Sequence, residues 1–328
     1  MFAAAVGVRY FDSGPATGVG HADTSVQIRG FALPSWEVHG YDGPDVEQSL
    51  REVKALGANW VQFTPTWYQE TRTSSEIYRT EKSVSDAGQE RAIQIAHGLG
   101  LKVLLKPHLN LAVHGSNKIR PDDRPAWFRS YTDFITHYAA MAQRLGAEQF
   151  AVATELSGTT DDRPGWLAVI QAVRDLYDGV LTYASGPDWE HVTFWDALDY
   201  IGVHAYAKLS DTPTTDVQAL KRAAEPYVER LAALSATYNR KIVFTEAGYT
   251  SQRGTTTNPS SWTISKIEDQ AEQAAGYETL LSTFGDQPWF GGMFWWVWIN
   301  PPYSEPDVFD FSPKGKAAEE VIRRWWGV

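Results

Sequence analysis

The sequence contains no cysteine, which excludes disulfides, thiolate metal sites and cysteine nucleophiles and leaves the redox compartment open. No apolar run approaches the ~20 residues that a membrane-spanning helix needs. Positive charge is scarce, because 29 basic residues accompany 40 acidic ones and give a formal net charge of −11. That balance argues against nucleic acid or an anionic membrane as a partner. No glycine-rich phosphate loop, GxSxG elbow or zinc-protease helix motif is present.

The chain has ample material for a core, since 43% of its 328 residues are hydrophobic. Eight short apolar runs alternate with segments of helical periodicity, which predicts a parallel sheet with right-handed crossovers. The eight runs lie at 29–34, 58–65, 102–110, 148–158, 180–185, 199–206, 241–249 and 289–298. Eight such units close a barrel, so we predict the α/β class and a single-domain (β/α)8 TIM barrel. An open, doubly wound sheet is the alternative, and the missing phosphate loop weakens it.

The domain boundaries follow from this pattern. Residues 29–328 are predicted to form one (β/α)8 catalytic barrel, and residues 1–28 an N-terminal extension. Links from helix to strand are short, whereas links from strand to helix are long. The long links lie at about 67–83, 109–124, 206–215, 249–265 and 298–313. The working face of such a barrel is formed by the loops that follow the strands, so we expect the site there.

Two predicted strands, the fourth and the seventh, end in a glutamate. Glu155 follows the apolar run 150–153, and Glu246 follows the run 242–244. An ionised carboxylate beside an apolar strand is costly unless something uses or pairs it. The fourth and seventh strands of a barrel face each other across the mouth. Hydrolysis of a glycosidic bond with retention needs such a pair of carboxyl groups, roughly 5 Å apart.

Several motifs resemble those of a known family. The segments ATELSGT (153–159), GVHAYA (202–207), FTEAGY (244–249) and FWWVW (294–298) with SPKGKAAEEV (312–321) resemble glycoside hydrolase family 113. That family belongs to a large clan of retaining glycosidases with glutamates on barrel strands four and seven. The resemblance implies that Glu155 is the catalytic acid/base, that Glu246 is the nucleophile, and that the activity is that of an endo-β-1,4-mannanase.

The predicted enzyme acts on a β-linked oligo- or polysaccharide, needs no cofactor or metal, and is expected to be a monomer. Three alternatives remain open: an exo-acting β-mannosidase, another β-glycanase such as a cellulase, and an inactive carbohydrate-binding barrel. We expect Glu246→Ala to abolish turnover and to leave folding largely intact.

Further polar residues at strand ends are candidates for binding the sugar. Tyr206 resembles the tyrosine of the clan that hydrogen-bonds the nucleophile, and His204 shares its strand face. His108 and Asn110 alternate with Lys106 onto one face of the third strand. Most of the clan has asparagine before the acid/base, where it binds the sugar 2-hydroxyl. Here that position is Thr154, whose hydroxyl could serve the same role.

Tryptophans form the last group of candidates, because a flat sugar face stacks well on an indole ring. Trp296 is predicted to be the floor under the scissile sugar, and strand alternation places Trp298 on the same face. Trp295 then faces the other way, into the packing between strands and helices. Tryptophans after other strands or in long loops are candidates for outer subsites: Trp36, Trp67, Trp189 and Trp262.

Overall fold

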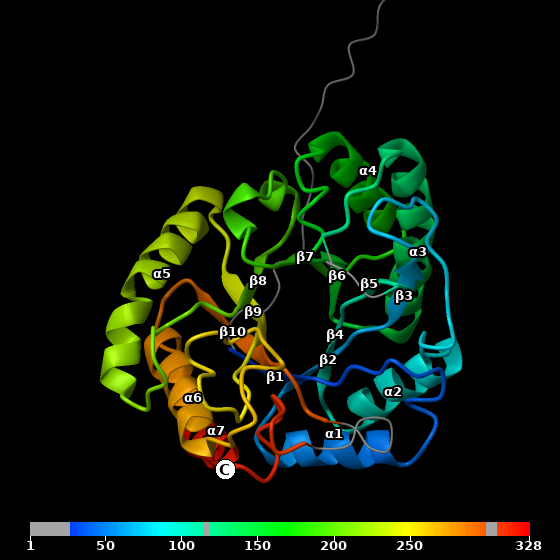
Figure 1. Ribbon diagram of the computed structural model, residues 1–328. Coiled ribbons are helices and arrows are strands. Elements are labelled where there is room, and N and C mark those ends of the chain that lie inside the picture. Colours follow the sequence, from blue (N-terminus) through cyan, green and yellow to red (C-terminus); the bar gives the residue numbers. More distant parts are fainter. Residues whose placement is uncertain (1–26, 114–117, 300–306) are drawn as a thin grey trace, which may run out of the picture.

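Eight parallel strands close into a barrel in the computed structural model, which describes residues 27–113, 118–299 and 307–328 (Figure 1). The barrel strands are β1 (Ile28–Ala32), β2 (Trp60–Phe63), β4 (Lys102–Leu105), β6 (Gln149–Thr154), β7 (Val180–Ser185), β8 (Ile201–Ala205), β9 (Ile242–Ala247) and β10 (Phe290–Trp295). β1 closes the ring by pairing with both β2 and β10. The predicted (β/α)8 barrel is confirmed. Most of the predicted N-terminal extension, 1–26, lies outside the described residues, so its boundary stays a prediction.

Helices surround the barrel, as Figure 1 shows. They are α1 (Asp45–Ala55), α2 (Asp86–Gly98), α3 (Arg124–Leu145), α4 (Arg163–Arg174), α5 (Val217–Tyr238), α6 (Gln270–Phe284) and α7 (Ala317–Trp326). Between β7 and β8 the sequence predicts only a short helical piece around Trp195, and the structure has two 3-10 turns there, η1 (Trp189–His191) and η2 (Trp195–Ala197). No helix in the described ranges is both long and apolar enough to cross a membrane.

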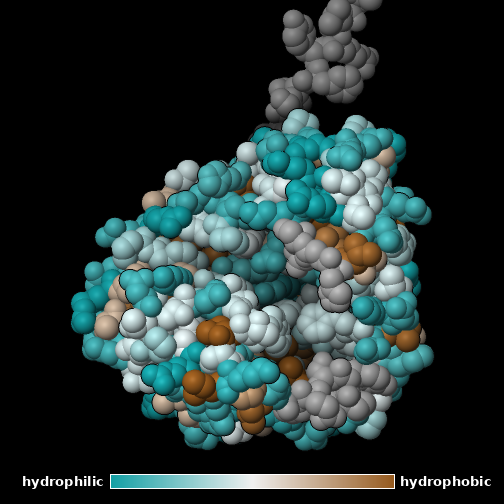
Figure 2. Space-filling model, viewed as in Figure 1, coloured by the Kyte–Doolittle hydropathy of each residue, from teal (hydrophilic) through white to brown (hydrophobic). Residues whose placement is uncertain are grey.

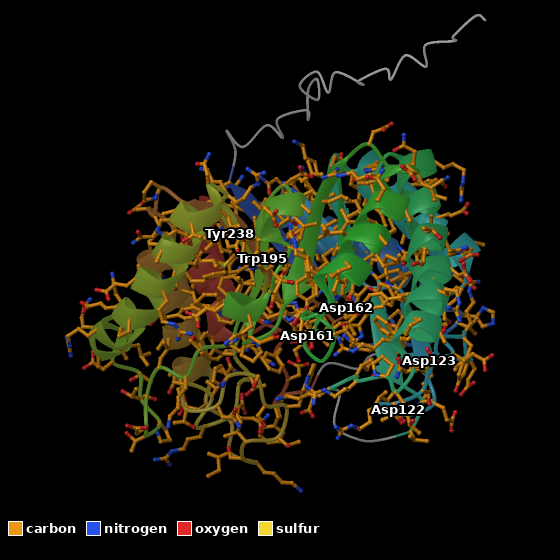
Figure 3. All side chains as sticks on the ribbon, turned by 90° about the horizontal axis from the view of Figure 1, so that it is seen from above. Asp122, Asp123, Asp161, Asp162, Trp195 and Tyr238 are labelled. Atoms are coloured by element: carbon orange, nitrogen blue, oxygen red, sulfur yellow. The ribbon has the colours of Figure 1, made fainter. Side chains whose placement is uncertain are left out.

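Aspartates begin several of these helices. Asp123 accepts the backbone N–H of Ala126 (2.9 Å) at the start of α3, and Asp162 accepts that of Gly165 (3.0 Å) at the start of α4. Such caps satisfy N–H groups that have no partner within the helix. Figure 3 places Asp123 and Asp162 toward one side of the molecule and Tyr238, the last residue of α5, toward the other. Because the barrel strands are all parallel, the helices that connect them run antiparallel to the strands.

The third predicted strand differs from the expectation. The run 102–110 divides into β4, which belongs to the barrel, and β5 (His108–Leu111), which pairs instead with β3 (Thr66–Gln69) in a separate two-stranded parallel sheet. Pro107 lies at the break. Because proline has no backbone N–H, it cannot continue a hydrogen-bonded ladder. The two small strands extend the connections after β2 and β4 above the barrel.

Side chains alternate between the inside of the barrel and the layer of helices. The interior is filled by the buried cluster Ile28, Trp60, Leu104, Ala151, Tyr200, Val243 and Phe294. Their sequence neighbours on the strands, such as Val61 and Phe244, belong to the larger core between strands and helices. Gly30 leaves room for one interior ring, since a methyl group there would lie 2.3 Å from the ring of Phe294. The barrel is therefore packed below its mouth, which leaves the strand ends as the place for a site.

Candidate active site

A hollow lined by hydrophilic residues opens at the centre of the face shown in Figure 2. This face carries the long connections that follow the strands, as the sequence predicts. Glu155 and Glu246 reach it from β6 and β9, which lie on different sides of the ring. The local backbone of each glutamate departs from regular strand geometry, and that departure determines where its side chain points.

Glu246 points toward the mouth because β9 contains a β-bulge. Val203 of β8 lies level with Phe244, and the next residue of β8, His204, lies level with Glu246. Thr245 is therefore an extra residue in β9, and the pairing with β10 shows the same shift. In a regular strand Glu246 would share the face of Phe244, which packs in the core between strands and helices. Bulges re-aim side chains in this way and occur often beside active sites.

Glu155 follows β6 directly and adopts a left-handed backbone conformation, with φ of 53°. This region is uncommon for a residue with a Cβ, and such residues occur preferentially at functional sites. The conformation is stabilised because the N–H of Glu155 donates to the carbonyl of Ala184 (2.9 Å) and the next N–H, of Leu156, donates to the hydroxyl of Tyr183 (2.9 Å). The side chain of Glu155 is 43% exposed, so solvent or a ligand can reach it.

One imidazole ring connects the two glutamates. The Nδ1 atom of His204 lies 2.8 Å from Oε1 of Glu155, and its Nε2 atom lies 3.4 Å from Oε1 of Glu246. The His204 side chain is only 1% exposed and holds a fixed place beneath both carboxylates. The two carboxyl groups therefore face a single cavity.

Lys106 is the buried cation of this site. Its Nζ atom forms a salt bridge with Oε1 of Glu246 and lies 3.4 Å from Nε2 of His204. The Gln62 amide, oriented to donate to the carbonyl of Thr245 (2.9 Å), accepts a further hydrogen bond from Nζ (3.2 Å). The Lys106 side chain is fully buried, and the Glu246 side chain is 11% exposed. The sequence suggested Lys106 only as a ligand of sugar hydroxyls. A lysine directly after the buried apolar run 103–105 is the signal for a buried counter-ion.

The electrostatics of the site follow from this packing. Burial raises the pKa of Glu155, but the nearby His204, followed by His108 and Lys106, outweighs that effect and lowers it to about 2. Burial lowers the pKa of His108 to about 4, with Glu155 and Glu246 acting in the opposite sense and Lys106 in the same sense. Burial and the charge of Glu246 raise the pKa of Tyr206 well above its ordinary value. At neutral pH, Glu155 is thus ionised in the unliganded site, and His108 and Tyr206 are neutral.

The structure brings some of the predicted binding residues to the carboxylates. Tyr206 donates its hydroxyl to Oε2 of Glu246 (3.1 Å). His108 is close enough to both glutamates for their charges to act on it. Thr154 is 2% exposed and donates its hydroxyl to the carbonyl of Pro107 (3.2 Å), so a sugar cannot receive that proton without breaking this bond. Asn110 lies on β5, where its side-chain oxygen accepts the N–H of Leu111 (2.8 Å).

Two of the predicted tryptophans, Trp36 and Trp296, line the mouth. The rings of Trp36 and Trp296 meet edge to face with centroids 6.2 Å apart, and both belong to a cluster that also contains Tyr206 and Phe311. Nζ of Lys106 lies 5.5 Å from the centre of the Trp296 ring. Trp296 therefore adjoins the carboxylate site directly.

Trp67, Trp189 and Trp298 lie elsewhere, which corrects the prediction. Trp189 is 2% exposed, and the guanidinium of Arg230 lies 5.0 Å from the centre of its ring. Trp298 is 2% exposed, and its indole N–H donates to Glu52 of α1 (3.1 Å). Strand β10 ends at Trp295, so alternation cannot be extended to position 298. Trp67 packs on α3, where its N–H donates to the hydroxyl of Tyr138 (2.9 Å) and Arg79 covers its ring. Trp295 stacks on Tyr277 in the core between strands and helices, as expected.

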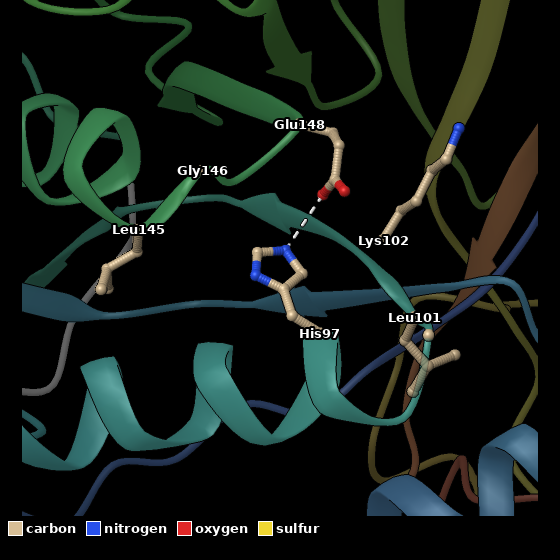
Figure 4. A pocket seen from close by; sticks show the side chains of 7 residues that line it. His97, Leu101, Lys102, Leu145, Gly146 and Glu148 are labelled. Atoms are coloured by element: carbon tan, nitrogen blue, oxygen red, sulfur yellow. Dashed lines mark hydrogen bonds and ion pairs between the residues drawn. The ribbon is translucent and has the colours of Figure 1, made fainter.

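A separate depression lies at the other end of the barrel, near the starts of β4 and β6 (Figure 4). There His97 pairs with Glu148 (3.3 Å), whose Oε2 atom also accepts the N–H of Val103 (2.7 Å). These contacts fasten the last turn of α2 to two strands. Among the residues that line the depression, Glu148 is the single carboxylate. Its contacts stabilise the packing of α2 against the barrel, and the depression lacks the paired carboxyl groups of a glycosidase site.

Comparisons with known proteins agree with this geometry. The family model of Glycoside Hydrolase Family 113 matches residues 30–310. The β-mannanase of that family from Alicyclobacillus acidocaldarius, solved in complex with ManMIm, is 28% identical, with a TM-score of 0.82 over 93% of this chain and 99% of the other. A second β-1,4-mannanase structure of the family is 26% identical, with a TM-score of 0.81 over 92% and 98% of the two chains. No protein with curated annotation matches in sequence.

Proposed function

This chain belongs to glycoside hydrolase family 113 and is a glycoside hydrolase, and from that premise we propose that it cleaves β-1,4-mannosidic bonds by a retaining double displacement. Glu246 is the proposed nucleophile and Glu155 the proposed acid/base. The observation that carries the proposal is the single His204 ring in contact with both carboxylates, which puts them at one cavity over the ends of β6 and β9.

The first step requires an ionised nucleophile held in a fixed orientation. Lys106 and Tyr206 each contact a different oxygen of Glu246, so both oxygens have a partner. The positive charge of Lys106 compensates the carboxylate in a site that excludes most water. A carboxylate oxygen of Glu246 attacks the anomeric carbon, the glycosidic C–O bond breaks, and the leaving oxygen takes a proton from Glu155.

Glu155 can donate that proton only after the sugar has changed its surroundings. The pKa of Glu155 is low in the unliganded site chiefly because His204 opposes the effect of burial. A bound sugar covers the exposed side of the carboxyl group and removes water from it, which favours the neutral acid. In the second step Glu155, now a base, takes a proton from water, whose oxygen attacks the anomeric carbon and releases Glu246.

Several features support a β-mannan as the substrate. Two structural relatives, 26% and 28% identical over nearly their whole length, are described as a β-1,4-mannanase and a β-mannanase. Trp36 and Trp296 offer aromatic surface at the mouth for the apolar face of a sugar. Thr154, which precedes Glu155, already donates its hydroxyl proton to the carbonyl of Pro107. This bond disfavours the contact that an asparagine at this position usually makes with an equatorial 2-hydroxyl of the sugar. In mannose that hydroxyl is axial. We propose cleavage within the polymer chain because the same two relatives are described as mannanases.

The stereochemistry can be read directly from the first product. Mannohexaose is incubated with the enzyme, and the anomeric protons of the new reducing end are followed by NMR before mutarotation. We expect the β-anomer first and a ladder of oligomers. An α-anomer would contradict the retaining mechanism, and release of mannose alone from one end would contradict internal cleavage. Parallel assays on mannan, glucomannan, cellulose and xylan test the sugar.

Chemical rescue tests the two assignments separately. Glu155→Ala should be slow on mannooligosaccharides, because their leaving oxygen needs a proton in the first step. On an activated aryl β-mannoside, which needs no such proton, azide should accelerate the variant and give a β-mannosyl azide, because azide needs no general base in the second step. Glu246→Ala should yield an α-azide from an activated β-mannosyl fluoride. If azide gives the same anomer with both variants, the assignment of the two roles is wrong.

A further inference from the structure

Trp262 is exposed although it lies in a hydrogen-bonded connection beside the catalytic mouth. The loop between β9 and α6 carries it, and its relative exposure is 46%. Ile267 of the same loop and Val308 of the loop before α7 are also exposed, at 56% and 52%. Exposed large apolar side chains near a cleft are candidates for an interaction surface.

The backbone of Trp262 is fixed by a buried glutamine. Gln252 is 1% exposed, and its Nε2 atom donates to the carbonyls of Trp262 (2.7 Å) and Phe309 (2.8 Å). Its Oε1 atom accepts the backbone N–H groups of Ile264 (3.0 Å) and Ser265 (2.9 Å). All four hydrogen-bonding positions of this amide are therefore used to hold the segment that presents Trp262 and to tie it to the neighbouring loop.

A buried carboxylate fixes the preceding turn. Glu272 of α6 is fully buried and accepts the N–H of Gly254 (2.7 Å), the N–H of Thr256 (3.0 Å) and the hydroxyl of Thr256 (2.6 Å). Burying a carboxylate is costly unless strong donors satisfy it, and here three of them do. The loop is thus preorganised, and the exposure of Trp262 is a feature of a rigid structure. Preorganised aromatic surface loses little entropy when a ligand binds.

The Trp262 ring is continuous with the catalytic site. It packs edge to face on Phe311, with ring centroids 4.7 Å apart. Phe311 in turn lies 6.1 Å from the ring of Tyr206, which donates to Glu246. Phe311 is 1% exposed, so Trp262 covers it from the solvent side. One edge of the indole is therefore anchored to the mouth, and much of its remaining surface is free.

We propose that Trp262 is the stacking platform of an outer subsite, which binds a sugar unit of the β-linked chain beyond those held at Glu155 and Glu246. This inference rests on the proposed function, since it takes the ligand to be the same glycan. An indole face matches the apolar face of a pyranose ring and leaves the sugar hydroxyls in water. The subsite contributes affinity and positioning for long substrates and nothing for substrates too short to reach it.

The test compares short and long substrates in matched variants. Trp262→Ala should lower kcat/KM on mannohexaose by about tenfold, the usual consequence of removing an aromatic anchor, and change it less than about twofold on an aryl β-mannobioside. Trp262→Phe should restore most of the loss. The control is Trp325→Ala, which removes another exposed tryptophan (40%) from the last turn of α7 and should change neither value.

Every outcome either supports or contradicts the proposed subsite at Trp262. An equal loss on both substrates, or a fall in melting temperature beyond that of Trp325→Ala, would assign Trp262 a structural role and overturn the subsite. No loss on either substrate would overturn it too. Affinity electrophoresis in gels containing mannan, glucomannan, hydroxyethylcellulose or xylan provides a readout that needs no turnover. If the wild type cleaves no mannan, the proposed function fails. Retardation of the wild type by one of the glycans, lost in Trp262→Ala, would then still support the platform.

Discussion

Removing the proposed nucleophile should destabilise the fold as well as abolish turnover. From the sequence we expected Glu246→Ala to leave folding largely intact, and the structure changes that expectation. Glu246 is the counter-ion of Lys106, whose side chain has no exposure to solvent. In the alanine variant the other groups that contact Nζ are a neutral amide oxygen of Gln62 and the imidazole of His204. A buried cation would lose its only formal negative partner in direct contact among the described residues.

The size of the effect follows from the burial of the pair. Breaking a buried ion pair by removing one partner costs about 3–5 kcal/mol, because the remaining charge is desolvated and uncompensated. The lower end applies here, since the Glu246 side chain is 11% exposed and water can enter the vacated space at the mouth. A loss of about 3 kcal/mol is a large share of the roughly 5–15 kcal/mol by which folded domains are stable.

Urea unfolding at pH 7, followed in parallel by tryptophan fluorescence and far-ultraviolet circular dichroism, gives the free energy of unfolding. Four variants complete the experiment: Glu246→Ala, Lys106→Met, the double variant, and Glu155→Ala as a matched control. The double variant should regain most of the stability lost in Glu246→Ala, because it no longer buries an unpaired charge. Glu155→Ala should cost no more than about 1 kcal/mol, since its carboxylate is 43% exposed and ion pairs of that kind contribute little.

Two results would refute this reasoning. One is a Glu246→Ala protein that is as stable as Glu155→Ala. The other is a double variant no more stable than Glu246→Ala, because the loss would then come from packing and not from the unpaired cation.

Three further predictions concern the same site. Tyr206→Phe removes one hydrogen bond to a charged oxygen of Glu246 (3.1 Å), so kcat/KM should fall about 10- to 100-fold in steady-state assays, and an unchanged value would contradict the role of Tyr206. His204→Gln should raise the pKa of Glu155 by about 1–3 units, because burial then acts with less opposition; carbon NMR titration of the carboxyl group measures this, and a constant pKa would count against it. His108 has a folded-state pKa of about 4, below the ordinary 6.5, so the unfolded chain binds its proton first and stability should fall as the pH drops from 6.5 toward 4. The ionised Glu155 adds stability above its ordinary pKa of 4.5, which is lost as the pH falls toward 2. In urea unfolding at about pH 7 and pH 5, His108→Asn should lose less stability on acidification than the wild type, and an equal loss would contradict the assignment.

Residue periodicity was enough to predict the barrel, because it is a local property of the chain. Alternating apolar runs and helical stripes give eight strands and most of the helices, and long connections after the strands indicate the working face. The same reasoning failed where a local pattern is interrupted. Pro107 divides a predicted strand in two, and the end of β10 at Trp295 invalidates the alternation that had grouped Trp298 with Trp296.

The fold class, the family and the two glutamates could be inferred from the sequence, since each strand pattern and each glutamate motif is a short continuous segment of the chain. The orientation of those glutamates and their partners emerged from the three-dimensional structure. The extra residue in β9 turns Glu246 from the helix layer to the mouth, and Lys106 reaches it from a strand on another part of the ring. Strand register and the partners of buried charges depend on contacts between segments that are far apart in the sequence. A local residue pattern does not specify those contacts.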